Sequence, residues 1–187
     1  SAQVAYASKA FSSVAMYQVM QQENLSLDVV SAGELFTAIK AGFPVERIHF
    51  HGNNKSKEEL LLALEHNIGC IVVDNFYEIE LLKMLTATHK QKVKILLRVT
   101  PGVEAHTHDY ITTGQQDSKF GFDLLNGQAD QAFLDVYQDE YIQLLGLHCH
   151  IGSQIFETIG FKVAAEKLIT KMIEWHTDYG FLCSVLN

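Results

Sequence analysis

The sequence has little proline, few cysteines and no long run of positive charge. Its only 2 prolines, Pro44 and Pro101, fall where turns are expected. Its 3 cysteines, Cys70, Cys149 and Cys183, are an odd and widely spaced set in apolar surroundings. This pattern argues against a disulfide framework and predicts reduced, buried thiols in a cytosolic protein.

Membrane spans and nucleic-acid binding are also poorly supported. No apolar run approaches the roughly 20 residues that a membrane helix needs, and no signal-peptide pattern is present. The formal net charge is -8 and no basic stripe stands out, which argues against nucleic acid and anionic membranes as partners. Hydrophobic residues make up 48% of the chain and charged residues 19%, as in globular domains.

What the sequence does contain is a regular alternation of strand and helix patterns. The strand-like segments are apolar through their centres, as in parallel strands that are buried on both faces. We expect strands at Val4–Ser8, Leu27–Val30, Arg47–His51, Gly69–Val73, Val93–Thr100 and Leu144–His150, and one from Leu182 to the end of the chain. We expect helices from Ser12 or Ser13 to Gln22, from the capping-box pair Ser31 and Glu34 to about Ala41, and at Lys57–His66, Phe76–Thr88, Gln128–Tyr137 and Phe161–Tyr179.

Repeated βα units predict either an open doubly wound sheet or a (β/α)8 barrel. About seven regularly spaced strands favour the barrel, which would then be incomplete, because a full barrel has eight strands in about 250 residues. Residues 101–122 interrupt the alternation, and a loop of that length inside a compact domain is usually functional or disordered.

In a barrel the active site lies where the strands end on their carboxyl side. Each complete strand of this sequence carries a polar or ionisable residue near that end. These residues are Lys9, Asp28, His51, Asp74 with Asn75, Arg98, and His148 with His150. We therefore expect the ends of the later strands to wall a pocket that holds Lys9.

Lys9 suggests Schiff-base chemistry. A lysine must be neutral to attack a carbonyl, and burial among Tyr6, Ala7 and Phe11 would favour the neutral amine. The alternative is a solvated charge just past the end of a strand, because lysine is mostly exposed in proteins.

His148 and His150 are two residues apart, so they face one side of their strand while Cys149 faces the helices. The two rings could bind a metal if His51 or Asp28 supplied a third ligand. One ring could instead pack on a flat aromatic cofactor, or be a hydrogen-bonded core residue. We expect no bound metal.

Two loops carry weaker signals. Residues 151–154 (Ile-Gly-Ser-Gln) offer donors suited to an anion such as phosphate. His106, His108 and Asp109 resemble a metal cluster, although such a run is more often a solvated loop or part of a pocket mouth.

Taken together, six motifs in this order resemble the fold-type III, pyridoxal-phosphate-dependent decarboxylases, and among them those that act on diaminopimelate. The motifs are 6–10 (YASKA), 28–31 (DVVS) with Gly33 and Glu34, 51–56 (HGNNKS), Arg98 with Val99, 118–121 (SKFG), and 148–154 (HCHIGSQ). The resemblance implies an α/β fold, a (β/α)8 TIM barrel of the alanine racemase and ornithine decarboxylase type. Residues 1–187 would be its pyridoxal-phosphate-binding domain, with the family's C-terminal β-domain absent.

The resemblance also implies roles for individual residues. Lys9 would be the catalytic residue that holds the aldehyde of pyridoxal phosphate as an internal aldimine. The other cofactor-binding residues would be Asp28 and Arg98 around the ring, His51 at the pocket mouth, His150 stacked on one ring face, and Ser153 near the phosphate.

The implied activity is decarboxylation of meso-2,6-diaminopimelate to L-lysine and carbon dioxide, the last step of lysine biosynthesis. It would take place in a cytoplasmic homodimer with Lys119 near the subunit interface. The sequence starts directly with a strand and stops at Asn187, before the family's glycine triplet and Glu-Pro-Gly-Arg segment, so we expect a truncated piece that is inactive alone. The alternatives are another amino-acid decarboxylase or a racemase on the same barrel, or a non-catalytic fragment.

Overall fold

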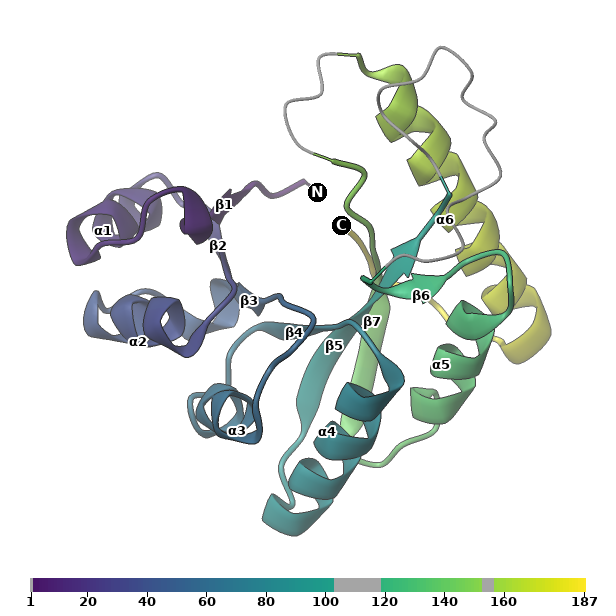
Figure 1. The fold of residues 1–187 in the computed structure, drawn as a ribbon, viewed down its shortest axis with the longest axis horizontal. Helices are drawn as coiled ribbons and strands as arrows, with labels where there is room; N and C mark the ends of the chain where they lie inside the picture. The colour runs from purple at the N-terminus through teal and green to yellow at the C-terminus, as the bar shows by residue number, and fades with distance from the viewer. Residues whose placement is uncertain (1, 103–118, 153–156) are drawn as a thin grey trace.

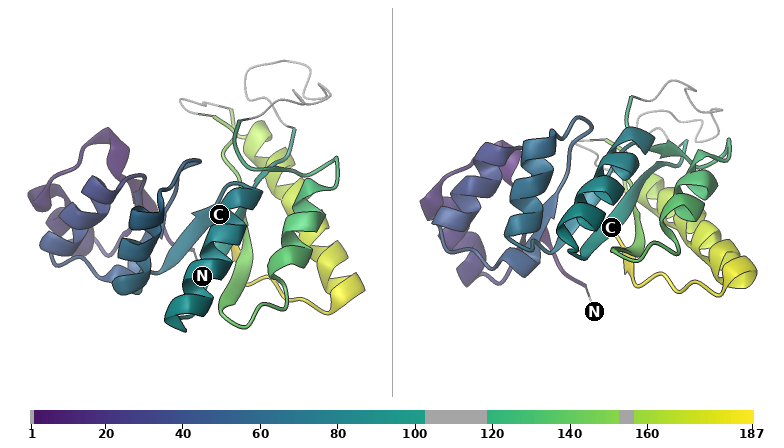
Figure 2. Two further views of the ribbon diagram at one scale, coloured as in Figure 1. Left: turned by 60° about the horizontal axis from the view of Figure 1, so that its bottom comes forward. Right: turned by 90° about the horizontal axis from the view of Figure 1, so that it is seen from below.

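The protein is a curved layer of parallel strands with helices along its outer side (Figure 1). The computed structural model describes residues 2–102, 119–152 and 157–187. Helices cover the outer face of the strands in the other two views as well (Figure 2). None of the described helices is long and apolar enough to cross a membrane.

Seven strands form the main sheet in the order β1-β2-β3-β4-β5-β7-β8, and every neighbouring pair is parallel. They are β1 (Ala5–Ala7), β2 (Ser26–Val29), β3 (Ile48–Phe50), β4 (Cys70–Val73), β5 (Val93–Thr100), β7 (Ile142–His148) and β8 (Val185–Leu186). A two-residue strand, β6 (Phe122–Asp123), pairs with the end of β5 beside this path. The architecture is therefore an open half-barrel of βα units, which confirms the predicted fold class.

Helices connect the strands along the outer side of the sheet. They are α1 (Val14–Gln22), α2 (Ala32–Lys40), α3 (Lys57–Glu65), α4 (Phe76–His89), α5 (Gln128–Val136) and α6 (Ile159–Tyr179), with short 3-10 helices η1 (Ser8–Ala10) and η2 (Val45–Arg47). Helices α1 to α4 each begin at a side-chain cap, namely Ser13, Ser31, Ser56 and Asn75. Such caps satisfy amide groups that the first turn leaves unpaired.

The predicted capping box at Ser31 and Glu34 is only half formed. The Glu34 amide donates to the Ser31 hydroxyl as expected. The Glu34 carboxylate, however, accepts from the Val30 amide and from the Ser8 hydroxyl instead of the Ser31 amide. A complete capping box occurs one unit later, at Ser56 and Glu59. The hydroxyl of Ser8, which belongs to an earlier unit, competes successfully for the glutamate.

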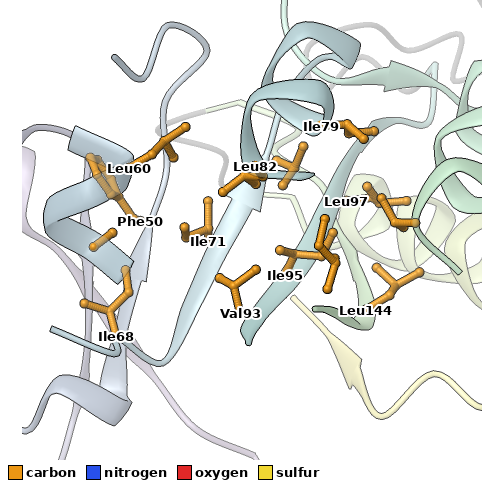
Figure 3. Packing of buried hydrophobic residues seen from close by; sticks show 14 of the residues in the cluster. Phe50, Leu60, Ile68, Ile71, Ile79, Leu82, Val93, Ile95, Leu97 and Leu144 are labelled. Atoms are coloured by element: carbon orange, nitrogen blue, oxygen red, sulfur yellow. The ribbon is translucent and has the colours of Figure 1, made fainter. Parts of the chain in front are cut away.

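The core lies between the sheet and the helices. Outward-facing strand residues such as Phe50, Ile71 and Ile95 pack against helix residues such as Leu60 and Leu82 (Figure 3). A smaller apolar cluster of Cys70, Val72 and Leu96 lies apart from this core. Alternation along the strands thus sends one set of side chains to the helices and leaves the other set on the inner face.

Candidate active site

A cavity of about 590 Å³ opens at the carboxyl ends of the strands, and its size is in the usual range for a small-molecule site. Five of the six predicted cofactor-binding residues line it: Lys9, Asp28, His51, Arg98 and His150. The sixth, Ser153, lies outside the described residues. His148 also lines the cavity, together with Ala7, Val30, Gly52, Asn53 and Phe120.

Lys9 reaches this cavity from the 3-10 helix that follows β1. The expected burial of Lys9 is wrong, because its side chain is exposed and its neighbour Phe11 is 62% exposed. The chain turns into η1 directly after Ala7, and Ser8 takes the buried position instead. The Lys9 amine makes no hydrogen bond or ion pair with the residues that the structure describes, so it is available to a ligand.

Asp28 is held between two histidines. Its Oδ1 atom lies 3.0 Å from His49 Nδ1 and 3.4 Å from His51 Nε2. Burial opposes ionisation of Asp28, but the rings of His49 and His51 more than compensate and lower its pKa. Asp28 therefore carries a negative charge at neutral pH. Sequence reasoning did not single out His49, although its spacing of two from His51 on one strand was the available signal.

The ligand atoms of Asp28, His49 and His51 all lie within 4.8 Å of one another, so this group has the composition of a possible metal site. The metal site considered from the sequence was a different one, formed by His148 and His150 with His51 or Asp28 as the third ligand. Asp28 and His49 are already joined by a hydrogen bond, which explains why these two side chains lie close together. The other suggested cluster, at residues 106–109, lies outside the described residues.

His148 and His150 occupy different environments. His148 ends β7, is buried, and its Nδ1 lies 2.6 Å from Asn187 Oδ1. Burial, with His51 beside it, lowers the pKa of His148 to about 3, so the ring is neutral. His150 lies beyond the strand and is exposed to the cavity. Cys149 packs against the core on the helix side, as predicted.

The three cysteines are free thiols, as expected. Only Cys70 is buried, whereas Cys149 and Cys183 are half-buried. The expectation that all three are buried is therefore wrong for two of them.

Arg98 lines the cavity from the end of β5, beside His148 of β7. Its Nη1 lies 3.3 Å from Asp74 Oδ1, and its guanidinium lies over the Phe120 ring at 4.5 Å from the centroid. Phe120, which sequence reasoning did not place in the site, thus helps to fix this cation. The cavity combines an amine with no partner among the described residues, an ionised carboxylate, three imidazole rings and a guanidinium, a set suited to a small anionic ligand with a carbonyl group.

Comparison with known proteins assigns the family. Residues 1–187 match the family model described as "Pyridoxal-dependent decarboxylase, pyridoxal binding domain". The chain belongs to this family.

Individual relatives agree with the family assignment. The chain is 69% identical over 186 residues to a diaminopimelate decarboxylase of Bacillus subtilis, and 62% identical to that of Bacillus methanolicus. These alignments cover 100% of this chain but 42% and 43% of the two relatives. A crystal structure of diaminopimelate decarboxylase from M. jannaschii with L-lysine matches at a TM-score of 0.90 and 33% identity, over 99% of this chain and 42% of that chain. The chain therefore spans less than half the length of these relatives.

Membership of the pyridoxal-dependent decarboxylase family implies pyridoxal phosphate as the cofactor, and the cavity fits such a group. His51 Nε2 is a buried polar atom without a hydrogen bond among the described residues, despite lying close to Asp28. The Lys9 amine, which has no hydrogen bond or ion pair among the described residues, is the polar group at the cavity that an aldehyde cofactor can satisfy.

Proposed function

We propose that the protein containing this chain decarboxylates meso-2,6-diaminopimelate to L-lysine and carbon dioxide. The observation that carries this proposal is the Lys9 amine, which has no partner among the described residues and faces a cavity lined by Asp28, His51, Arg98 and His150. The diaminopimelate decarboxylases among the relatives, at up to 69% identity, support the choice of substrate. When bound, pyridoxal phosphate supplies the electron sink that loss of carbon dioxide requires.

The residues of this chain have separate tasks. Lys9 binds the cofactor covalently through its amine. The ring of His150 would help to hold the cofactor ring, and burial with the nearby cations of Arg98 and Lys9 lowers the pKa of His150, which favours its neutral form. The ionised carboxylate of Asp28 and the guanidinium of Arg98 orient charged and polar groups of the cofactor and substrate. Ser153 binds near the cofactor phosphate.

Residues 1–187 act as the cofactor-binding barrel domain of a longer chain that also carries a C-terminal β-domain. We place the protein in the cytoplasm, which the free thiols support. It acts as a homodimer, with Lys119 near the interface. Lys119 is exposed, and its amine lies 5.1 Å from the centroid of the Phe120 ring at the edge of the cavity. An interface at Lys119 would therefore adjoin the site.

Release of carbon dioxide by the full-length protein tests the proposed reaction. We expect release from meso-2,6-diaminopimelate, and little from lysine, ornithine or arginine. Preferred release from ornithine or arginine would assign another decarboxylase, and racemisation without release would assign a racemase. The 187-residue chain alone should release none, and the Lys9→Ala variant should be inactive.

A further inference from the structure

A buried ion pair lies beside the cavity, between Lys55 and Glu78. Their side chains are 1% and 3% exposed, and Lys55 Nζ lies 2.7 Å from Glu78 Oε1. The same ammonium also donates to the carbonyl oxygens of Gly52 and Val72, each at 2.7 Å. All three donors of the ammonium are therefore used, and one of them holds Gly52, a residue that lines the cavity.

Glu78 extends this network to a second part of the cavity. Its other carboxylate oxygen, Oε2, accepts a hydrogen bond of 3.0 Å from the Asp74 amide. Asp74 is 2% exposed and forms the ion pair with Arg98. One buried carboxylate thus connects two cavity-lining residues, Gly52 through Lys55 and Arg98 through Asp74.

Two other helices carry a glutamate at the same position of the first turn, and the comparison shows what is particular to Glu78. Glu34 in α2 accepts from Val30 and Ser8, and Glu59 in α3 accepts from the amides of Ser56 and Ala32. Neither forms an ion pair with any residue that the structure describes, and neither is fully buried. Only Glu78 of these three is buried and joined to a cation.

Stability alone does not explain a buried pair of this kind. Removing two charges from water is costly, and replacing such a pair by uncharged residues of similar size is often neutral or even stabilising. A fully hydrogen-bonded network does, however, restrict the positions of the groups that it joins. The contacts of Lys55 reach the cavity at Gly52, and those of Glu78 reach it at Arg98 through Asp74.

We propose that Lys55 and Glu78 are positioning residues. They hold Arg98 and the backbone of Gly52 and Asn53, which forms one wall of the cavity, where the cofactor and substrate need them. The expected effect of this ion pair on cofactor affinity rests on the proposed function, whereas its expected effect on the backbone of Gly52 and Asn53 does not. Further support comes from the Asn75 side chain, which caps α4 and donates to the Asn53 carbonyl at 3.1 Å. This bond joins the start of α4 to the same wall.

The test uses the full-length protein and the double variant Lys55→Met/Glu78→Gln. This variant removes both charges, so neither partner is left as an unpaired buried ion, and the glutamine oxygen can still accept from the Asp74 amide. Glu59→Gln is the matched control, because it changes the equivalent residue of α3 without touching a cavity-lining residue. Three quantities are measured: the thermal unfolding midpoint, the backbone NMR order parameters of Gly52 and Asn53 without cofactor, and the dissociation constant of pyridoxal phosphate by absorbance titration.

The proposal predicts a local change without global destabilisation. The order parameters of Gly52 and Asn53 should fall from about 0.85, typical of rigid backbone, towards 0.6. The dissociation constant should rise at least about tenfold, since small misplacements near a site have large effects. The unfolding midpoint should stay within a few degrees of the parent. Glu59→Gln loses one of the two hydrogen bonds that the Glu59 carboxylate accepts, so its midpoint falls slightly, but the order parameters and the dissociation constant should not change.

Unchanged order parameters in a folded double variant would overturn the proposal. A fall in unfolding midpoint without a local change at Gly52 and Asn53 would also overturn it, because the pair would then be only structural. If the parent protein itself failed to bind pyridoxal phosphate, the proposed function would be wrong, and the order parameters would still decide the inference about Lys55 and Glu78.

Discussion

The rings of His51 and His148 lie edge to face, with centroids 4.8 Å apart and an interplanar angle of 74°. His51 follows β3 and His148 ends β7, and the sheet order places β4 and β5 between those strands. Neighbouring parallel strands are nearly 5 Å apart, so a flat sheet would hold these rings about 14 Å apart. Their contact shows how strongly the sheet curves and why its strand ends share one cavity.

The neutral state of His148 predicts a pH dependence of stability. Burial lowers its pKa from 6.5 to about 3, so the unfolded chain takes up a proton at higher pH than the folded one. The contribution of His148 is thus present above pH 6.5 and is lost as the pH falls towards 3, by about 1.4 kcal/mol per pH unit. Urea unfolding of the full-length protein should be measured at several pH values in this window. The free energy of unfolding should fall less with decreasing pH in His148→Gln than in the parent.

The exposed histidine His176 supplies the control for that experiment. His176→Gln should show the same acid loss of stability as the parent. An equal loss in His148→Gln and the parent would contradict the assignment of a buried, neutral His148.

The ionisation of Asp28 should depend on His49. Burial raises the pKa of Asp28, and the hydrogen bond with His49 is the largest of the influences that lower it. In the variant His49→Phe the Asp28 carboxyl should therefore titrate at higher pH, as followed by carbon NMR of the carboxyl group. The stability that Asp28 contributes is present above its ordinary pKa of 3.8 and is lost as pH falls below it. An unchanged Asp28 titration would show that His49 does not stabilise the charge.

A side chain at Gly121 should be destabilising because of Arg98. A Cβ atom at Gly121 would lie 2.8 Å from the Arg98 carbonyl oxygen and 3.2 Å from its Cγ, and the residue has φ of +73°. Gly127 has a similar φ of +89° but nothing within 4 Å of such an atom. Gly127→Ala should cost about 1 kcal/mol for the left-handed backbone, whereas Gly121→Ala should cost about 2 kcal/mol more for the forced shift.

Urea unfolding and cofactor titration of the two variants check this expectation. Gly121→Ala should also weaken binding of pyridoxal phosphate, because the forced shift displaces Arg98. Equal stabilities and affinities for the two variants would mean that Arg98 can move aside freely.

The sequence predicted regular elements well where local pattern determines them. The bounds of β5 are confirmed at both ends, because an apolar, β-branched run is closed by Pro101. The two residues of β6 were missed, since they form a strand only by pairing with Val99 and Thr100 from a distant part of the chain. Residues 103–118 of the predicted long loop lie outside the described residues.

The candidate site was predictable where its residues lie at strand ends, and not where it depends on tertiary contacts. Strand ends located Lys9, Asp28 and Arg98 at one cavity, because the barrel geometry follows from the βα alternation. The exposure of Lys9 was the stated alternative, because lysine is mostly exposed. The burial of Ser8 was not predictable, since its hydroxyl bonds to Glu34 of another unit. The Lys55–Glu78 pair joins residues 23 positions apart. No local pattern signals such a tertiary contact.

The most direct test of the account is to find the lysine that binds the cofactor. The full-length protein is loaded with pyridoxal phosphate, reduced with borohydride to fix the covalent bond, digested, and its peptides are analysed by mass spectrometry. We expect the label on Lys9, its loss in Lys9→Ala, and its retention in the control Lys57→Ala at the exposed start of α3. A label on another lysine, or one that persists in Lys9→Ala, would contradict the assignment of Lys9 as the residue that binds the cofactor.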